Sequence, residues 1–247
     1  ALVEGDQTAL DKAQPSQSIP SEQALQSVSG CEAAVTDTYD QFQSVGRYGQ
    51  FYMLYPDALS DNAGFIQGAN RYNDVTRNQI GAHLTDYANP YDAINLANNV
   101  ITKIQGFEDI QAPDPQQIRD RIRGQAHFLR ALNYFDLVRT KAYEPGREVN
   151  GFDSGVILRT EPTETPADAD FRSRSTNAEV YSQIVSDLET AVNLLEGKDL
   201  SKFRANEAAA QGLLARVHLY LENWSAAEQA ATNAIQDADA VLGAQMM

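Results

Sequence analysis

Apolar positions recur every three or four residues over six stretches of the chain, and polar segments separate these stretches. That spacing places the apolar side chains on one face of an α-helix, as expected for helices that bury one side against a neighbour. The sequence therefore predicts six main helices in three antiparallel pairs. The expected ranges, pair by pair, are 21–45 with 87–104, 114–141 with 176–195, and 206–221 with 225–239.

The last pair, within Ala208 to Val241, has the features of a tetratricopeptide-type helical hairpin. Such a unit cannot bury its own apolar face, so it requires similar neighbours along the chain. The predicted fold class is therefore all-α: a tetratricopeptide-like helical-hairpin solenoid (α-α superhelix) with long loop excursions. We expect a tryptophan and several small residues to pack where the two helices cross. The residues at the characteristic offsets are Leu214, Ala215, Trp224, Ala227 and Ala234.

Several helices are preceded by side chains that accept hydrogen bonds from the free backbone N–H groups of a first turn. Proline tolerates the first helical position, and a glutamate or glutamine three residues after the cap can bond back to it. The expected starts are Asp114 with Pro115 and Gln117, Thr176 with Glu179, Ser225 with Glu228, and Ser21.

The pattern divides the chain into an extended lead-in over 1–20, a helical domain over 21–241 and a terminal tail over 242–247. Two long excursions, at about 48–86 and 143–176, interrupt the helical pairs, and a short β-bridge is expected at Gly155 to Leu158. Loops of that length in a compact domain are usually functional or mobile. The excursions are therefore the first places to look for a binding site.

Charge narrows the choice of partners, because the net charge is −15 and the pI is near 4.5. Most of the protein surface would repel nucleic acid and anionic membranes, whereas the charge does not exclude neutral ligands. The sequence shows neither a signal peptide nor an apolar run long enough to span a membrane. The single Cys31 lies between apolar neighbours, so we expect a buried thiol.

Catalytic and metal-binding motifs are absent from the sequence, so we expect no enzyme activity, no catalytic residue, no metal and no cofactor. His127 and His218 lie within helical patterns, where a place at the edge of the core is expected. Asp168 with Asp170, or Asp237 with Asp239, offers oxygen ligands but lacks the ordered calcium-loop pattern.

Arginines are concentrated in the helix expected over 114–141, which raises the question of an anion site. The alternative, a solvated face that pairs with the acidic remainder of the chain, is favoured. The arginines concerned are Arg119, Arg121, Arg123, Arg130 and Arg139.

Aromatic residues gather in the first excursion and alternate with amides and carboxylates. Aromatic faces that pack on sugar rings, with polar groups bonding the hydroxyls, are what a carbohydrate site needs. Alternatively, Phe51, Tyr52 and Tyr55 pack inward as a covering helix. The candidate ligand-binding residues are Phe65, Arg71, Tyr72 and Asn73.

Several segments together resemble the SusD/RagB family of surface lipoproteins. Their order and spacing agree over nearly all of residues 14 to 235. The segments are QPSQSIPSEQAL, SDNAG, DYANPYDAINLANNVITKI, RGQAHFLRALNYFDLVR, GVILRTEPT, STNAEVYSQIVSDLETAVNLL and AAAQGLLARVHLYLENWSAAEQAATNAI.

The resemblance implies a protein held by a lipidated cysteine on the outer face of the outer membrane of a Gram-negative bacterium. There, members of the family bind glycans or other nutrients and act as a lid over a SusC-like TonB-dependent transporter. It implies noncovalent capture and handover without a cofactor.

The chain departs from the family pattern at several points. No lipidation cysteine starts it, Cys31 lies too deep in a helix for that role, and TKAYEP replaces a glycine-rich turn at Thr140 to Pro145. Family members are roughly twice as long, which indicates a portion of a larger protein or an end covered by another chain. A generic tetratricopeptide-like scaffold for protein interactions is the alternative function, and a helical hydrolase using scattered carboxylates is a distant third.

Overall fold

The computed structural model describes residues 25–60, 62–64, 72–79, 87–108, 110, 112–165, 168, 170–197 and 203–245, with side chains of the last helix described to residue 238. Its elements are α3 (Val28–Gln41), α4 (Phe51–Leu59), α5 (Asn73–Thr76), α6 (Ala88–Lys103), the 3-10 helix η2 (Ile104–Gly106), α7 (Pro115–Lys141), α8 (Asn177–Leu195), α9 (Glu207–Tyr220) and α10 (Trp224–Gln245).

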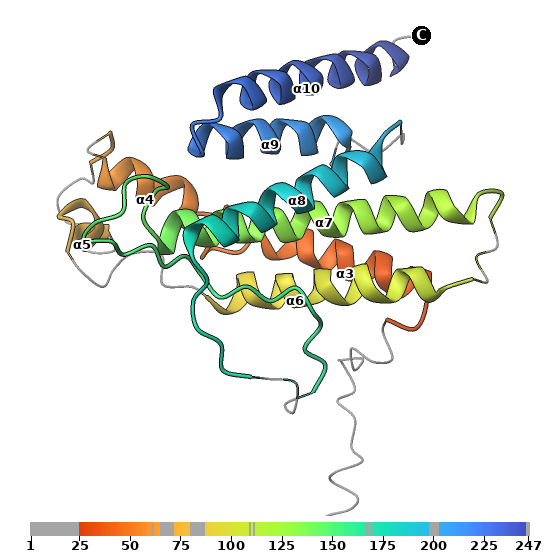
Figure 1. Ribbon diagram of the computed structural model, residues 1–247, viewed down its shortest axis with the longest axis horizontal. Helices are drawn as coiled ribbons and strands as arrows, with labels where there is room; N and C mark the ends of the chain where they lie inside the picture. The colour runs from red at the N-terminus through yellow and green to blue at the C-terminus, as the bar shows by residue number, and fades with distance from the viewer. Residues whose placement is uncertain are drawn as a thin grey trace, which may run out of the picture.

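The long helices pack in sequence order, as Figure 1 shows. α3 contacts α6 and α7, α6 contacts α7, and α7, α8, α9 and α10 follow as successive neighbours. Within the described residues the regular structure is helical, and the one β-bridge pairs Ser154 with Thr176, just before the expected Gly155 to Leu158. The predicted all-α, tetratricopeptide-like fold is confirmed, while the domain boundaries at residues 20 and 241 stay a prediction.

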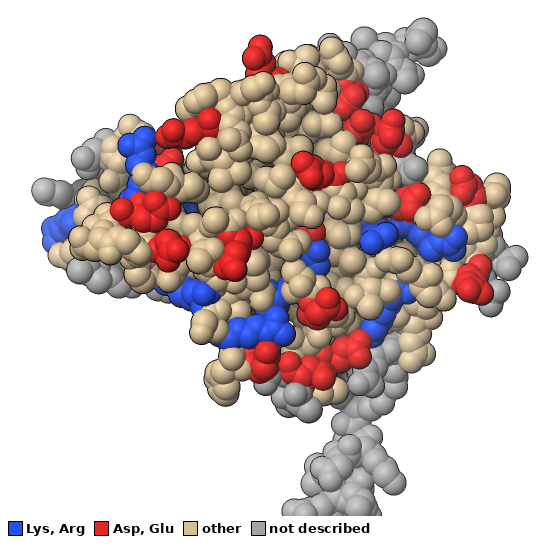
Figure 2. Space-filling model, viewed as in Figure 1, with Lys and Arg blue, Asp and Glu red and all other residues tan. Residues whose placement is uncertain are grey.

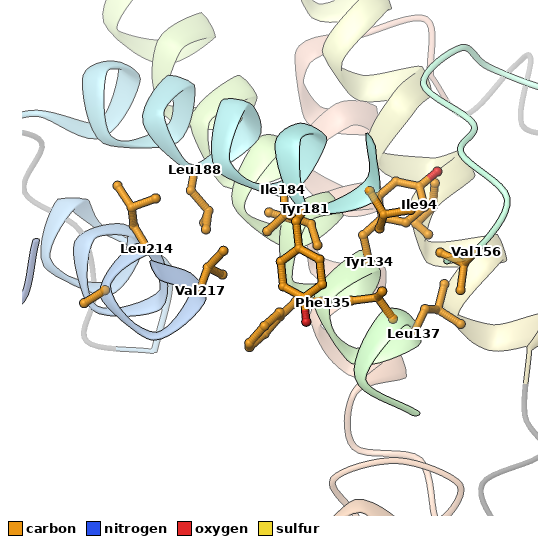
Figure 3. Close-up of a cluster of buried hydrophobic side chains, with 14 of the residues drawn as sticks. Ile94, Tyr134, Phe135, Leu137, Val156, Tyr181, Ile184, Leu188, Leu214 and Val217 are labelled. Atoms are coloured by element: carbon orange, nitrogen blue, oxygen red, sulfur yellow. The ribbon is translucent and has the colours of Figure 1, made fainter. Parts of the chain in front are cut away.

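α7 is the central helix, and apolar side chains cover it from two sides. On one side Tyr134, Phe135 and Leu137 join residues of α8 and α9 in the cluster shown in Figure 3. On the other, Ile122 and Leu129 pack against α3 and α6. The broad apolar arc in the sequence of α7 therefore reflects burial between two layers.

The predicted helix starts are confirmed at two places. Asp114 accepts a hydrogen bond from the backbone N–H of Gln117 at 3.0 Å. Thr176 and Glu179 form a reciprocal capping box at the start of α8. Ser21 lies outside the described residues.

The predicted capping box at Ser225 and Glu228 is wrong, because α10 already begins at Trp224. The carbonyl of Asn223 accepts the hydrogen bond from Ala227 N at 2.9 Å. The first helical hydrogen bond thus starts from the backbone of Asn223, earlier than the serine pattern suggested.

The expectation that Trp224 packs between the last two helices is also wrong. Trp224 is 62% exposed, whereas Ala227 and Ala230 are buried. Small residues let the backbones of α9 and α10 approach, and the tryptophan stands at the corner where α10 begins. Leu219 and Ile235, both more than half exposed, add to the apolar surface of these helices.

The first excursion is more ordered than the loop that its composition predicted, because α4 and α5 lie within it. Phe51 and Tyr55, four residues apart, stack with ring centroids at 4.6 Å. Tyr55 is buried with Ala58 and Val75 in a small cluster of its own. The alternative of a covering helix is therefore confirmed for Tyr55, whereas Phe51 and Tyr52 are only half-buried. Pro56 lies inside this helix.

None of the described helices is both long enough and apolar enough to cross a bilayer.

Candidate functional site

The link between α3 and α4 is fastened to α7 by a buried arginine. Arg47 is completely buried and donates from Nη1 to Oδ1 of Asn133 at 2.8 Å. Its Nη2 lies 3.2 Å from Oδ2 of Asp136, and its guanidinium carbon lies 3.9 Å from the centroid of the Phe42 ring. Since both polar partners are on α7, this contact fixes where the chain enters α4.

Asp136 is shared by further donors, which makes it the centre of this arrangement. The hydroxyl of Tyr48 donates to its Oδ1 at 2.8 Å, and Nη2 of Arg139 lies 2.6 Å from the same oxygen. Burial, reinforced by the neighbouring Asp136 carboxylate, raises the pKa of Tyr48 well above its usual value. The phenol therefore stays protonated and keeps donating. We call Arg47, Tyr48, Asn133, Asp136 and Arg139 the end cluster.

The end cluster positions an aromatic and apolar surface on α4 and α5. Tyr48 and Tyr52 meet edge to face with ring centroids at 5.4 Å, and Tyr55 and Tyr72 do so at 6.1 Å. Gln50 donates a hydrogen bond to the hydroxyl of Tyr72. The α4–α5 surface, as named here, consists of Tyr48, Tyr52, Met53, Leu54, Tyr72 and Asn73, which are exposed or half-buried.

Two of the residues predicted from the sequence fall on this surface. Tyr72 and Asn73 are half-buried at the start of α5, and the Tyr72 carbonyl accepts a hydrogen bond from Thr76 Oγ1 at 3.0 Å. Phe65 and Arg71 lie outside the described residues. The structure thus brings Tyr72 against Tyr55 of α4, and the role of the predicted residues in binding stays a prediction.

The residues that hold this surface in place were not predicted from the sequence. Arg47 and Asp136 are 89 positions apart, so no local pattern links them. Asn133 and Asp136 are polar residues three positions apart within the apolar arc of α7. That interruption of the arc is the pattern that would have indicated a buried polar contact.

A second buried cluster lies nearer the middle of α7 and corrects the interpretation of its arginines. Arg130 is 5% exposed and donates to both oxygens of Asp187 on α8, at 2.6 and 2.8 Å. It also donates to Asn98 of α6 at 2.8 Å, and His127 Nδ1 lies 2.8 Å from Asp187. We call Asn98, His127, Arg130 and Asp187 the middle cluster. Arg130 is therefore not part of a solvated face, because it joins three helices.

The other arginines of α7 are more accessible, and two of them pair with acids as predicted. Arg121 pairs with Glu32, and Arg139 with Asp136. Arg119 instead donates to the carbonyl of Phe107 at 3.0 Å and to Gln116.

Asn95 and Asn98 of α6 bond the backbone of the segment that follows α7. Asn95 donates to the carbonyl of Thr163 and accepts from its N–H, and Asn98 donates to the carbonyls of Arg159 and Glu161. The side-chain amides thus bond backbone groups of this extended segment that a neighbouring strand would bond in a sheet.

The described residues include no group of three or more side chains suited to hold a metal ion. Asp170 pairs instead with Arg159 and Arg172. Cys31 is fully buried, and burial raises the pKa of its thiol to about 11. His127 is buried and His218 half-buried, as places at the edge of the core require.

Charged side chains of both signs are interspersed on the face shown in Figure 2, where the lysines and arginines lie close to acids. In the part of this view occupied by α9 and α10, an uncharged area is bordered by acidic side chains.

Similarity to known proteins extends over most of the helical stack. The sequence model of a SusD-like family, described as "Starch-binding associating with outer membrane", matches residues 8–219. The SusD-like protein P38 of Formosa agariphila is 27% identical over 230 residues, which are 90% of this chain and 41% of that protein.

Solved structures agree with the sequence match. A SusD superfamily protein from Bacteroides vulgatus superposes with a TM-score of 0.69 at 26% identity, over 87% of this chain and 48% of that one. One from Bacteroides thetaiotaomicron gives 0.64 at 27% identity, over 85% and 46%. The chain spans less than half of each of these relatives. Because the family match covers most of its length, this chain belongs to the SusD-like family, whose members are described as starch-binding and associated with the outer membrane.

Proposed function

We propose that this protein captures a glycan on the α4–α5 surface without breaking bonds, and passes it to a SusC-like TonB-dependent transporter in the outer membrane. A lipid anchor outside this chain would hold it at the cell surface. Two observations carry the proposal: the family membership, and the tyrosines in and beside α4 and α5, of which Tyr48 is bonded to Asp136 and contacts Tyr52.

The chemistry of the α4–α5 surface suits a sugar. One face of a pyranose ring carries mostly C–H groups and packs against aromatic rings, while its hydroxyls need hydrogen-bonding partners. Tyr48, Tyr52 and Tyr72 supply rings, and Asn73 supplies an amide beside them. With a net charge of −15 on the chain, a neutral glycan meets less repulsion than an acidic one.

The second step of the proposal, transfer of the glycan to a transporter, is supported by the exposed apolar side chains on α9 and α10. Leu219, Trp224 and Ile235 are each more than half exposed. Exposed large apolar residues grouped on neighbouring elements are typical of protein contacts. The same feature would serve a general interaction scaffold, which is the alternative function.

A binding assay with substitutions on α5 tests the capture step. The purified chain should bind at least one of soluble starch, laminarin or xyloglucan in affinity electrophoresis, and leave it uncleaved. Tyr72→Ala should weaken binding about five- to tenfold, since a stacked ring contributes about 1–1.5 kcal/mol. Asn73→Ala should weaken it less.

Tyr72→Phe is the matched control, because it keeps the ring and the contact with Tyr55 while it removes only the hydroxyl. Binding by Tyr72→Ala equal to wild type would place the ligand elsewhere. Release of sugars by the purified protein would overturn noncovalent capture.

A further inference from the structure

The loop that follows α7 contains the one asparagine of the sequence that is followed directly by glycine, Asn150 before Gly151. Both residues are exposed. Exposed loop tips with small or polar residues are among the least protected positions of a folded protein. An asparagine side chain carries an electrophilic amide carbon, Cγ, and the backbone nitrogen of the next residue is a nucleophile that lies close to it. The pair therefore contains both partners of a possible reaction.

Asn150 and Gly151 form the centre of a tight turn. Their φ angles are 54° and 72°, and Phe152 N donates to the carbonyl of Val149 at 3.1 Å. This is the pattern of a type I′ turn, which Asn-Gly strongly favours. The hydrogen bond of the turn uses neither the Asn150 side chain nor the Gly151 N–H, and neither group has a partner among the described residues. Both groups are therefore available to react with each other.

The surroundings of Gly151 leave its nitrogen accessible. A Cβ added at this position would meet no other atom within 4 Å. Glycine has no side chain of its own to shield the nitrogen, and it allows the widest range of backbone angles, so the nitrogen can turn toward the Asn150 side chain. Reacting groups held next to each other in one chain react far faster than the same groups on separate molecules.

Asn78 provides a comparison within the same chain. It is exposed like Asn150 and has nearly the same backbone conformation, with a φ of 51°. The nitrogen that follows it, Gln79 N, donates to the carbonyl of Asp74 at 2.8 Å. Gln79 also carries a side chain beside this nitrogen. The nucleophile after Asn78 is therefore bonded and shielded, and the nucleophile after Asn150 is neither.

We propose that Asn150 is a site of spontaneous deamidation, a covalent modification that requires water and no enzyme. The Gly151 nitrogen gives its proton to water and bonds to Asn150 Cγ, the Cγ–Nδ2 bond breaks, and ammonia leaves. The product is a cyclic imide, which water opens at either carbonyl. Opening at Cγ gives aspartate, and opening at the backbone carbonyl gives isoaspartate, whose main chain runs through the former side chain. The whole reaction consumes water and releases ammonia.

The effect of the modification on the structure should stay local, because both ends of the loop are fastened. Arg174 donates to the carbonyls of Lys141 at 2.8 Å and Gly155 at 2.6 Å, on either side of the turn. Isoaspartate lengthens the main chain within the turn and adds a carboxylate. The hydrogen bond between Phe152 and Val149 should therefore be lost, whereas the bonds of Arg174 remain.

Peptide mapping by mass spectrometry tests the proposal on the folded, whole chain after incubation in neutral buffer. The peptide that contains Asn150 should exchange its amino group for a hydroxyl at least about tenfold faster than the peptide that contains Asn78. Ammonia should be released in matching amount. Purified isoaspartyl methyltransferase, used as a reagent, should methylate the Asn150 peptide.

Asn150→Gly is the matched variant, because glycine adopts a positive φ without strain and preserves the turn. It should abolish the mass change in this peptide and leave the Asn78 peptide as in wild type. In the aged wild type, amide hydrogen exchange should accelerate in 144–153, with 115–141 and 177–195 unchanged. Asn150→Asp, which adds the charge without lengthening the main chain, should show a smaller acceleration.

Two results would overturn the proposal. The first is a folded chain in which the Asn150 peptide keeps its mass while the same peptide reacts in the chain unfolded in urea, which would show that the turn protects the pair. The second is equal reaction at Asn150 and Asn78 in the folded chain, because the bonded and shielded nitrogen of Gln79 would then be no obstacle.

Discussion

The middle cluster and the end cluster use the same chemistry on one helix for different purposes. In the middle cluster, Arg130 and Asp187 join α7 to α8, between the large apolar clusters of the bundle. In the end cluster, Arg47 and Asp136 join α7 to the segment that leads into α4. The first stabilises the scaffold. The second positions α4 and α5, whose buried core, among the residues that the structure describes, consists of Tyr55, Ala58 and Val75.

The bundle and the α4–α5 region obtain their order from different interactions. The bundle buries many apolar side chains, and its buried ion pair is a further contribution beside this apolar burial. The described residues of the α4–α5 region bury few apolar side chains, so the place of this region depends on a few polar contacts between residues distant in sequence. Disrupting the two clusters should therefore give different results: global destabilisation for one and local opening for the other.

The largest effect is expected from Asp187→Ala. Removing this carboxylate leaves Arg130 and His127 buried without their partner, and such losses cost about 3–5 kcal/mol. The free energy of unfolding, measured by urea denaturation, should fall by that amount in one cooperative transition. Asp170→Ala is the control, since its pairs with Arg159 and Arg172 are exposed and contribute little. Equal stability of Asp187→Ala and wild type would contradict the assigned role.

The contribution of the Asp187 carboxylate to stability should also depend on pH. Burial by itself would raise the pKa of Asp187, but hydrogen bonds from His127 and Arg130 lower it below its usual range. A carboxyl whose pKa is lower in the folded state stabilises the fold above its unfolded pKa, about 4, and loses this effect as the pH falls. The stability difference between wild type and Asp187→Asn should therefore be full at pH 7 and shrink below about pH 4.

A smaller and more local effect is expected from Arg47→Met. Asp136 keeps Tyr48 and Arg139 as partners, so its charge is not left alone, while Asn133 loses its donor. An unsatisfied buried polar group costs about 1–3 kcal/mol. Amide hydrogen exchange should accelerate in 48–60 and 72–79, with α8 and α9 unchanged.

Arg47→Lys is the informative companion, because lysine keeps the charge but lacks the fork that reaches both Asn133 and Asp136. It should show most of the same local acceleration. Acceleration spread evenly over the whole bundle in either variant would mean that the end cluster stabilises the scaffold after all.

The helical stack could be predicted from the sequence because its determinants are local. Apolar periodicity located the long helices, and the caps at Asp114 and Thr176 placed two of their starts, as the structure confirms. Family resemblance, carried by the same segments, was confirmed by the match over residues 8–219. These features depend on neighbours within a few turns of chain.

The site could be predicted only in part, because its determinants are distant in sequence. The composition of the first excursion indicated an aromatic site and left a covering helix open, which α4 forms, yet nothing local linked Arg47 to Asp136. The error at Arg130 has a physical reason: a charged residue four positions after Ala126 lies on the buried arc, and only its partners on α6 and α8 explain it.

The most direct test of the account is a map of amide protection on glycan binding. Hydrogen exchange of the whole chain is compared with and without a saturating polysaccharide that it binds, such as soluble starch or laminarin. The account predicts added protection in 48–60 and 72–79, around the α4–α5 surface, with no change across α9 and α10. Protection confined to α9 and α10, with the α4–α5 region unaffected, would contradict it.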